Sequence, residues 1–448
     1  MNLLEVGQSV LGQVQRAARS AQAEIFLLGS ESRSCEWSGT SPENKIIAQS
    51  QGLGLRLIRE GRLGFGYANR WDKDALELLV RRAVAASDST VSDPLLELPE
   101  PVSGPSTNGL DLVDETLAQT PWEARARFLE TLETDLKKRS PRITQLLRGS
   151  YHEGRAQVAV LNSRGFAGTY EGTRAGFSLA AVAVEAGETQ IGYAFQGVRH
   201  HADLKPDWVI QRAAEHTVSL LGGKQIPTGR YDLVLDPFVA AEMLELLAGA
   251  LRADNVQKGK SFLTSKLGQS VGAACLTLAD HGRLPRGLAT APFDAEGQPT
   301  QKTRVMDRGR LQGFLFDSYT ARKGKTRSTG NAGRASYKGL PEPEASNFYL
   351  EAGSQTPEQL IGNVRSGIYI RSVMGLHTVN IISGDYSLGL MGERIENGAR
   401  THAVRGVTMA GNLLDLFRNV EAVGSDLIFS GSVGSPTLWI RDISVGGV

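Results

Sequence analysis

The amino-acid sequence predicts an α+β protein of several domains whose sheets are largely antiparallel. Stretches of β-type residues outnumber helical ones, and short turn signals such as Glu60-Gly61 and Asn397-Gly398 join many of them. Strands joined in this way pair locally and run antiparallel. The length of 448 residues is enough for several domains, roughly two to four at ~150 residues each.

The chain divides into three predicted domains and a linker. Residues 1–90 combine an amphipathic first helix, strands over "AEIFLLGSES" and "GLGLRLIREGRLGFGYAN", and a second helix that Asp72 can cap. Residues 91–119 are rich in proline and are predicted to form an extended linker. Residues 120–225 form a middle domain and residues 226–448 a β-rich C-terminal domain.

The middle domain is predicted to be a helix, an antiparallel meander and a second helix. Thr120-Pro121 begins a helix to about Arg139, strands extend from Ile143 to Gly197, and the last helix covers Asp207 to Leu221. The turn signals of the meander are Glu153-Gly154, Arg164-Gly165 and Ala186-Gly187. The C-terminal domain has hairpin signals at Arg308-Gly309 and Asn397-Gly398.

Composition and charge argue against several classes of partner. The formal net charge is +1, and no basic run predicts binding to nucleic acid or to an anionic membrane. The two cysteines, Cys35 and Cys275, lack a metal-type spacing and fit a reducing compartment. The N-terminal segment is unlike a signal peptide and no apolar run approaches membrane-spanning length. We therefore expect a cytoplasmic protein.

Three motifs that superficially indicate a site are rejected. "GQSVG" at 268–272 has the spacing of a nucleophile elbow around Ser270, but that elbow joins a strand to a helix, and here β-type residues continue. The glycines from Gly52 to Gly66 lie in strands and a hairpin, unlike a phosphate-binding loop. His200 and His201 are adjacent, and neighbouring side chains on an extended chain point in opposite directions, which disfavours a shared metal ion.

The segment "AAEMLELLAGALRAD" raises the main question about function. Asp236-Pro237 begins a helix predicted over 237–253, and apolar residues surround most of its circumference, as in an internal helix. Glu242 and Glu245 lie about one turn apart on it. Either they border a groove and pair with arginines, or burial without a partner raises their pKa. The candidate arginines are Arg252, Arg304 and Arg334.

The chain resembles the PmbA/TldD family, whose two-subunit peptidases consist of TldD and TldE (PmbA). The resemblance rests on several segments in order: "RADNVQKGKSFLTSKLGQSVG", "STGNAGRASY", "SGDYSLGLMGERIENG", "RGVTMAGNLLDLF" and "VGSDLIFSGSVGSPTLWIRDISVGG". The N-terminal "SQGLGLRLIREGRLGFGYAN" is similar to the first domain of the family, so the resemblance covers essentially the whole chain. It implies a PmbA/TldD-like fold.

For the catalytic subunit TldD, the resemblance implies the motif HExxxH on the corresponding helix, with its histidines and a later cysteine as zinc ligands and the glutamate as base. In this chain the motif falls on "LELLAG", Leu244 to Gly249. Glu245 keeps the glutamate position, but Leu244 and Gly249 occupy the ligand positions and "FSGSVGSPTL" has no cysteine. Catalytic zinc typically needs three protein ligands, and without it nothing lowers the pKa of water from ~15.7 toward ~7. We therefore expect no metal and no catalytic residue in this chain.

The resemblance implies a TldE/PmbA-type subunit that pairs with a zinc-bearing TldD-type paralogue in peptide maturation and in proteolysis of unfolded or modified peptides. An extended peptide can bind by adding a strand to a sheet edge. The loop at 329–337 matches a family loop near the active-site chamber, and two interpretations of it stay open. It is an ordinary hairpin connection, or its glycines and arginine contact the peptide. The candidate peptide-binding residues are Gly330, Asn331, Gly333, Arg334 and Tyr337.

Two other functions stay as alternatives. The chain is an autonomous hydrolase using Glu245, Ser270 or an unconventional metal site, or it binds and modulates DNA gyrase, as an older description of the family suggests. A homodimer is a further expectation where a TldD-type partner is missing, because paralogues of one fold can use equivalent surfaces. No nucleic-acid or membrane partner is expected.

Overall fold

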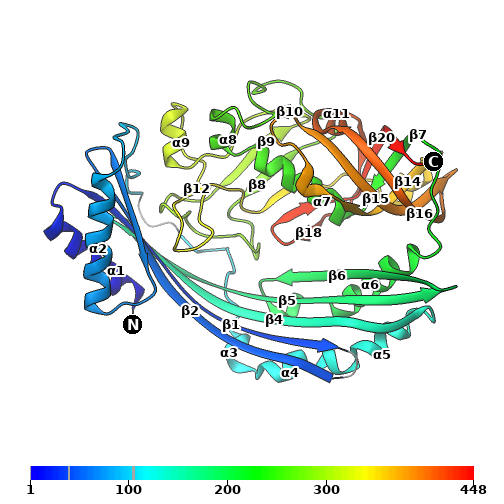
Figure 1. Ribbon diagram of the computed structural model, residues 1–448, viewed down its shortest axis with the longest axis horizontal. Helices are drawn as coiled ribbons and strands as arrows, with labels where there is room; N and C mark the ends of the chain where they lie inside the picture. The colour runs from blue at the N-terminus through cyan, green and yellow to red at the C-terminus, as the bar shows by residue number, and fades with distance from the viewer. Residues whose placement is uncertain (1, 39–40, 103–105) are drawn as a thin grey trace.

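The computed structural model describes residues 2–38, 41–102 and 106–448, which form two sheet-based regions lying one above the other (Figure 1). Most strand pairs are antiparallel, and the parallel pairs β7–β14 and β13–β19 lie in the C-terminal region. The predicted α+β fold with largely antiparallel sheets is confirmed.

The N-terminal and middle parts of the chain jointly form one long, curved sheet. Its six strands run in the order β3-β2-β1-β4-β5-β6, with every neighbouring pair antiparallel. The strands are β1 (Gln22–Ser38), β2 (Ser41–Arg59), β3 (Arg62–Ala68), β4 (Ile143–Asn162), β5 (Ala167–Glu185) and β6 (Glu188–Val198). The hairpin turns predicted at Glu60-Gly61 and Ala186-Gly187 are confirmed, and all four residues have the positive φ that a two-residue turn of type I′ requires.

The turn predicted at Glu153-Gly154 is wrong. Strand β4 continues through both residues because it lies inside the sheet, where Glu153 is paired with Arg33 of β1 and Ala175 of β5. The Glu153 carboxylate is buried and accepts hydrogen bonds from Arg125. A polar residue beside a glycine therefore marks a buried ion pair here.

Two helices cover one end of the curved sheet, α1 (Leu3–Ala17) and α2 (Lys73–Asp88) (Figure 1). Asp72 caps α2, as predicted, by accepting a hydrogen bond from the backbone N–H of Ala75 at 3.1 Å. The apolar faces of both helices pack on the sheet. The residues of this core include Val6, Val10, Leu27, Leu55 and Leu79.

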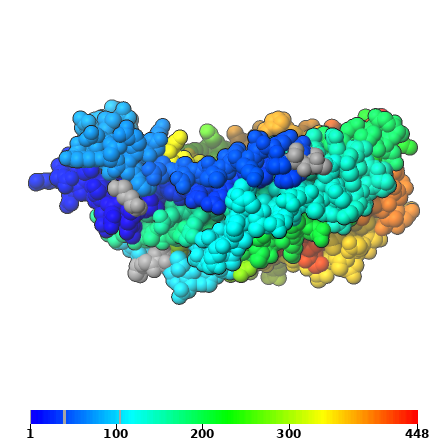
Figure 2. Space-filling model, turned by 90° about the horizontal axis from the view of Figure 1, so that it is seen from below, coloured from blue at the N-terminus to red at the C-terminus, as the bar shows by residue number. Residues whose placement is uncertain are grey.

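A second group of helices follows the lower side of the sheet: α3 (Thr116–Gln119), α4 (Trp122–Ala126), the 3₁₀ helix η1 (Arg127–Thr131) and α5 (Leu132–Lys137). The continuous helix predicted from Thr120 to Arg139 is wrong, because the 3₁₀ turn divides it. In the view from below, residues of this part of the chain, coloured cyan, lie on the outer surface of the molecule (Figure 2). Helix α6 (Pro206–Ser219) shares the same apolar core.

The C-terminal region contains two further six-stranded sheets. One has the order β16-β15-β14-β7-β20-β17 and consists of β7 (Gly229–Leu235), β14 (Ser366–Met374), β15 (Asp385–Glu396), β16 (Ala399–Asn412), β17 (Val420–Val423) and β20 (Leu438–Gly446). The other has the order β10-β9-β8-β13-β19-β18 and consists of β8 (Leu278–His281), β9 (Lys302–Asp307), β10 (Arg310–Leu311), β13 (Phe348–Leu350), β18 (Ile428–Ser430) and β19 (Val433–Ser435). A small hairpin pairs β11 (Ala332–Gly333) with β12 (Glu342–Pro343).

Helix α7 (Pro237–Ala250) lies in the core of this region, as expected for an internal helix. It ends at Ala250, earlier than the predicted 253, and α8 (Ala253–Gln257) begins a new direction. The remaining helices are α9 (Ser318–Lys323), α10 (Pro357–Gly362), α11 (Leu413–Arg418) and the 3₁₀ helices η2 (His201–Asp203) and η3 (Leu376–Thr378). Within the described ranges, we find no helix with the length and apolar character needed to cross a membrane.

Candidate functional site

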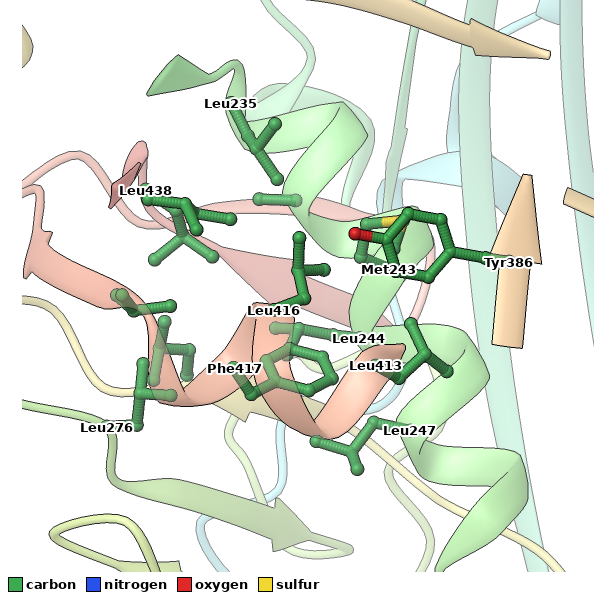
Figure 3. Packing of buried hydrophobic residues seen from close by; sticks show 14 of the residues in the cluster. Leu235, Met243, Leu244, Leu247, Leu276, Tyr386, Leu413, Leu416, Phe417 and Leu438 are labelled. Carbon is green, nitrogen blue, oxygen red and sulfur yellow. The ribbon is translucent and has the colours of Figure 1, made fainter. Parts of the chain in front are cut away.

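Helix α7 places the segment Leu244–Gly249 in two different environments. Asp236 caps the helix by accepting a hydrogen bond from a first-turn N–H at 3.0 Å, and Pro237 occupies the first turn, as predicted. Leu244 is 1% exposed and lies in the apolar core beside α11 (Figure 3). Glu245 is exposed and Gly249 is half-buried. The Leu244 side chain, at a position where the resemblance implies a zinc ligand, is therefore surrounded by hydrocarbon.

The residues around α7 do not fit a zinc ion. Leucine and glycine side chains carry no lone pair, and the cysteine-free segment with β18 and β19 packs directly against this helix. In the ranges that the structure describes, no group of three or more His, Cys, Asp or Glu side chains is arranged to hold a metal ion. The donor atoms that α7 and its neighbours present in these ranges are therefore not those of a zinc site.

Neither glutamate of α7 forms an ion pair with another described residue. Burial, with smaller contributions from Glu245 and Asp236, raises the pKa of Glu242 to about 7. Such a carboxyl group can exchange a proton near neutral pH, but it supplies no activated water by itself. Of the two alternatives, burial that raises the pKa holds for Glu242, and pairing with the three candidate arginines is wrong, because all three are bound elsewhere. Arg252 binds Asp254 and Glu342, Arg304 binds Asp307 and Glu351, and Arg334 binds Glu24.

Four of the five residues predicted to bind peptide line one cavity of about 280 Å³ between the curved sheet and the C-terminal region. They are Gly330, Asn331, Gly333 and Arg334. Gly330 has a φ of +70°, a conformation that favours glycine. Tyr337 lies apart from the cavity, and its ring packs over Gly52 and against the edge of Tyr67.

The polar side chains of this loop are engaged within the protein. Asn331 donates hydrogen bonds to Asp280, at 2.7 Å, and to the Glu344 carbonyl oxygen, at 2.9 Å. Burial raises the pKa of Asp280 to about 6. The guanidinium of Arg334 is 1% exposed and pairs with Glu24, which is fully buried. In this structure the Arg334 charge fastens the loop to β1.

Glu24 belongs to a buried chain of charges that joins the two regions. It also accepts a hydrogen bond from Arg56 at 2.7 Å, and Arg56 pairs with Glu296 at 2.8 Å. Each buried charge thus has an opposite partner, which buried charges require. These buried ion pairs hold the curved sheet and the C-terminal region together beside the smaller cavity.

A larger cavity of about 750 Å³ adjoins the first and was not predicted from the sequence. Strands β1, β4, β5 and β6 form one wall, and the loop 288–291 with Gly431 forms the other. Both cavities share Tyr170, Val158 and parts of the loop. Its lining includes Arg174, on β5, and Arg199, just after β6, which are 25 residues apart in the sequence, so no local pattern marked them.

The rejected motifs lie outside these cavities. Ser270 is in a loop between α8 and β8, without the strand-to-helix turn of a nucleophile elbow, and its hydroxyl faces the Gly272 carbonyl at 3.3 Å. His200 contacts Asp111, whereas the ring of His201 lies against Tyr151. The two imidazoles therefore have separate partners.

Comparison with known proteins identifies relatives along most of the chain. Models described as domain 1, the central domain and the C-terminal domain of PmbA/TldA metallopeptidases match residues 23–87, 115–221 and 228–447. Metalloprotease PmbA of Escherichia coli O157:H7 is 28% identical over 409 residues, covering 90% of this chain and 88% of that protein.

Two crystal structures have the same fold over nearly their full length. A Thermotoga maritima protein, named as a candidate modulator of a DNA gyrase, has a TM-score of 0.90 and 24% identity, covering 98% of this chain and 100% of that one. TldE from Thermococcus kodakarensis has a TM-score of 0.89 and 18% identity, covering 99% and 100% of the two chains.

Proposed function

Because the chain belongs to the PmbA/TldD metallopeptidase family, we propose that it is the non-metal subunit of a heteromeric peptidase of this family. A TldD-type paralogue would carry the zinc, and the pair would act on unfolded or modified peptides. The observation that carries this proposal is the chemistry of α7: Leu244 and Gly249 lie where the resemblance implies zinc ligands, and Leu244 is buried in the core.

The two adjoining cavities support a role in holding a peptide. Their volumes, about 750 and 280 Å³, are of the size that small ligands and short peptide segments occupy. Strand β6 is an outer strand of its sheet, and Phe195 to Gly197 line the larger cavity. An extended peptide there could use main-chain hydrogen bonds, which demand little of the peptide sequence.

A cytoplasmic location is part of the proposal. Both cysteines are free thiols, Cys35 buried and Cys275 exposed. Free thiols are stable in a reducing compartment.

The test is a three-way cleavage assay with an unfolded, fluorogenic peptide. This chain alone, a TldD-type paralogue from the same organism alone, and an equimolar mixture are compared, each with and without a zinc chelator. We expect chelator-sensitive cleavage in the mixture that exceeds the sum of the separate rates. A mixture with zinc-depleted partner is the matched control and should be inactive.

Three results would count against the proposal. Cleavage by this chain alone would favour the autonomous hydrolase, and equal rates for the partner alone and the mixture would remove any supporting role. Capture of DNA gyrase in a pull-down that captures no TldD-type paralogue would favour the gyrase-binding alternative.

A further inference from the structure

The larger cavity contains a buried arginine with no carboxylate partner among the described residues. Arg199, just after β6, is 9% exposed. Its guanidinium donates hydrogen bonds only to main-chain carbonyl oxygens, and its Nε has no partner. The acceptors are the carbonyls of Thr173 at 3.2 Å, Gly287 at 2.7 Å, Leu288 at 2.8 Å and Thr290 at 3.4 Å.

A second arginine in the same cavity also lacks a counter-ion. Arg174 on β5 is exposed and forms no ion pair with any residue in the described ranges. By contrast, Arg155 on the same wall pairs with Glu171 at 2.8 Å. The cavity carboxylate Glu31 is neutralised by Arg33 at 3.0 Å. The wall therefore carries positive charge that the protein itself does not balance.

The basic groups of this cavity wall lie close enough for the charge of one to lower the pKa of another. Burial and the charge of Arg174 lower the pKa of Arg199, and the same two causes lower the pKa of His152, which also lines the cavity. Arginine stays protonated even so. Like charges held together in a partly buried space cost free energy unless an anion binds between them.

The remainder of the wall is apolar or hydrogen-bonding without charge. Leu28, Val158 and Phe195 contribute hydrocarbon surface, and burial raises the pKa of Tyr170 to about 12, so its hydroxyl keeps its proton. Gly172 leaves space for Arg199, because an added Cβ would lie 2.7 Å from the guanidinium. The cavity thus combines apolar walls with a fixed cationic end.

We propose that this cavity recognises a carboxylate of the bound peptide, which Arg174 contacts directly while the buried Arg199 supplies a fixed positive charge. The inference rests on the proposed function, because it names the substrate chemistry of the same chamber. A guanidinium matches the two oxygens of a carboxylate. The carboxylate belongs either to the C-terminus of the peptide or to an acidic side chain.

The test measures the dissociation constant of three forms of one unfolded fluorescent peptide by anisotropy. They are the free acid, the C-terminal amide, and the amide with one internal glutamate, each added to this chain and to its mixture with the partner. We expect at least one carboxylate-bearing form to bind about tenfold tighter than the neutral amide, the usual scale of a charge-assisted contact. The preferred form identifies the source of the carboxylate, and added salt should reduce the preference.

Variants of Arg174 test whether this residue causes the preference for a carboxylate-bearing peptide. Arg174→Gln should bring the ratio of the dissociation constants of the amide and the carboxylate-bearing peptide to about one, and Arg174→Lys should keep part of the preference. Arg148→Gln is the control, since Arg148 is exposed, lies outside the cavity and changes the net charge equally. Arg174 is exposed, so Arg174→Gln should fold, and thermal unfolding verifies this.

The outcomes separate carboxylate recognition by the cavity from the proposed role as a peptidase subunit. Equal affinity for all three peptides, or an equal loss of preference in Arg148→Gln, overturns carboxylate recognition and leaves the proposed subunit role standing. Absence of binding for every peptide, with the partner present, overturns both.

Discussion

Replacing Glu24 with glutamine should strongly destabilise the protein. Glu24 is fully buried and is shared by Arg334, 1% exposed, and Arg56, 8% exposed. In Glu24→Gln, Arg56 keeps Glu296 at 2.8 Å, whereas Arg334 keeps only main-chain contact with Gly339. The buried Arg334 charge would then lack a counter-ion, and breaking such a pair costs about 3–5 kcal/mol.

The assay is urea unfolding at pH 7, with the free energy of unfolding obtained by linear extrapolation. Glu31→Gln is the matched control, because Glu31 pairs with Arg33 at the surface and its loss should cost about 0–1 kcal/mol. The double variant Glu24→Gln/Arg334→Met should recover part of the loss, since no unpaired charge remains. A loss below about 1 kcal/mol in Glu24→Gln would refute the reasoning that this chain of charges is a major tie between the two regions.

Three further predictions concern α7, the loop contact and the rejected elbow. Folding raises the pKa of Glu242 from 4.5 to about 7, so ionising it costs stability as pH rises through this window; Glu242→Gln should be neutral at pH 4 and stabilising at pH 9. The full pKa shift corresponds to about 3 kcal/mol, and we expect about 1.5 kcal/mol because the side chain is partly exposed. Urea unfolding at both pH values measures this stabilisation, and an equal effect of Glu242→Gln at pH 4 and pH 9 would contradict the prediction. Gly54→Ala places a Cβ 2.3 Å from the Tyr337 carbonyl oxygen and should cost about 1–3 kcal/mol in the same assay, a neutral result arguing against this contact. Ser270→Ala should leave the rate of peptide cleavage by the mixture unchanged. A large loss of rate would instead support Ser270 as a catalytic nucleophile.

Local patterns predicted the elements that depend on local chemistry. The turns at Glu60-Gly61 and Ala186-Gly187 need positive φ, and the cap at Asp236 needs a side-chain acceptor, so their residues identify them. The family segments that follow α7 place the HExxxH position on "LELLAG", where only Glu245 agrees with the motif. The structure places that helix in the core, as its apolar circumference indicated.

Features that depend on residues distant in sequence were not predicted. Glu153 beside a glycine indicates a turn until its partner Arg125 is known, and nothing local connects Arg334 with Glu24, 310 residues away. The cavity arginines are Arg174, on β5, and Arg199, just after β6, and they line one cavity only after the sheet forms. Pairing across a sheet and between regions is set by tertiary packing, which a single sequence does not display.

The most direct measurement of the central claim is the zinc content of this chain purified alone. The protein is incubated with excess zinc, dialysed against buffer, and analysed by mass spectrometry for metal per chain, with a TldD-type paralogue treated in parallel. The chemistry of Leu244 and Gly249 predicts much less than one zinc per chain here and close to one in the paralogue. One firmly retained zinc per chain in this protein would contradict the account.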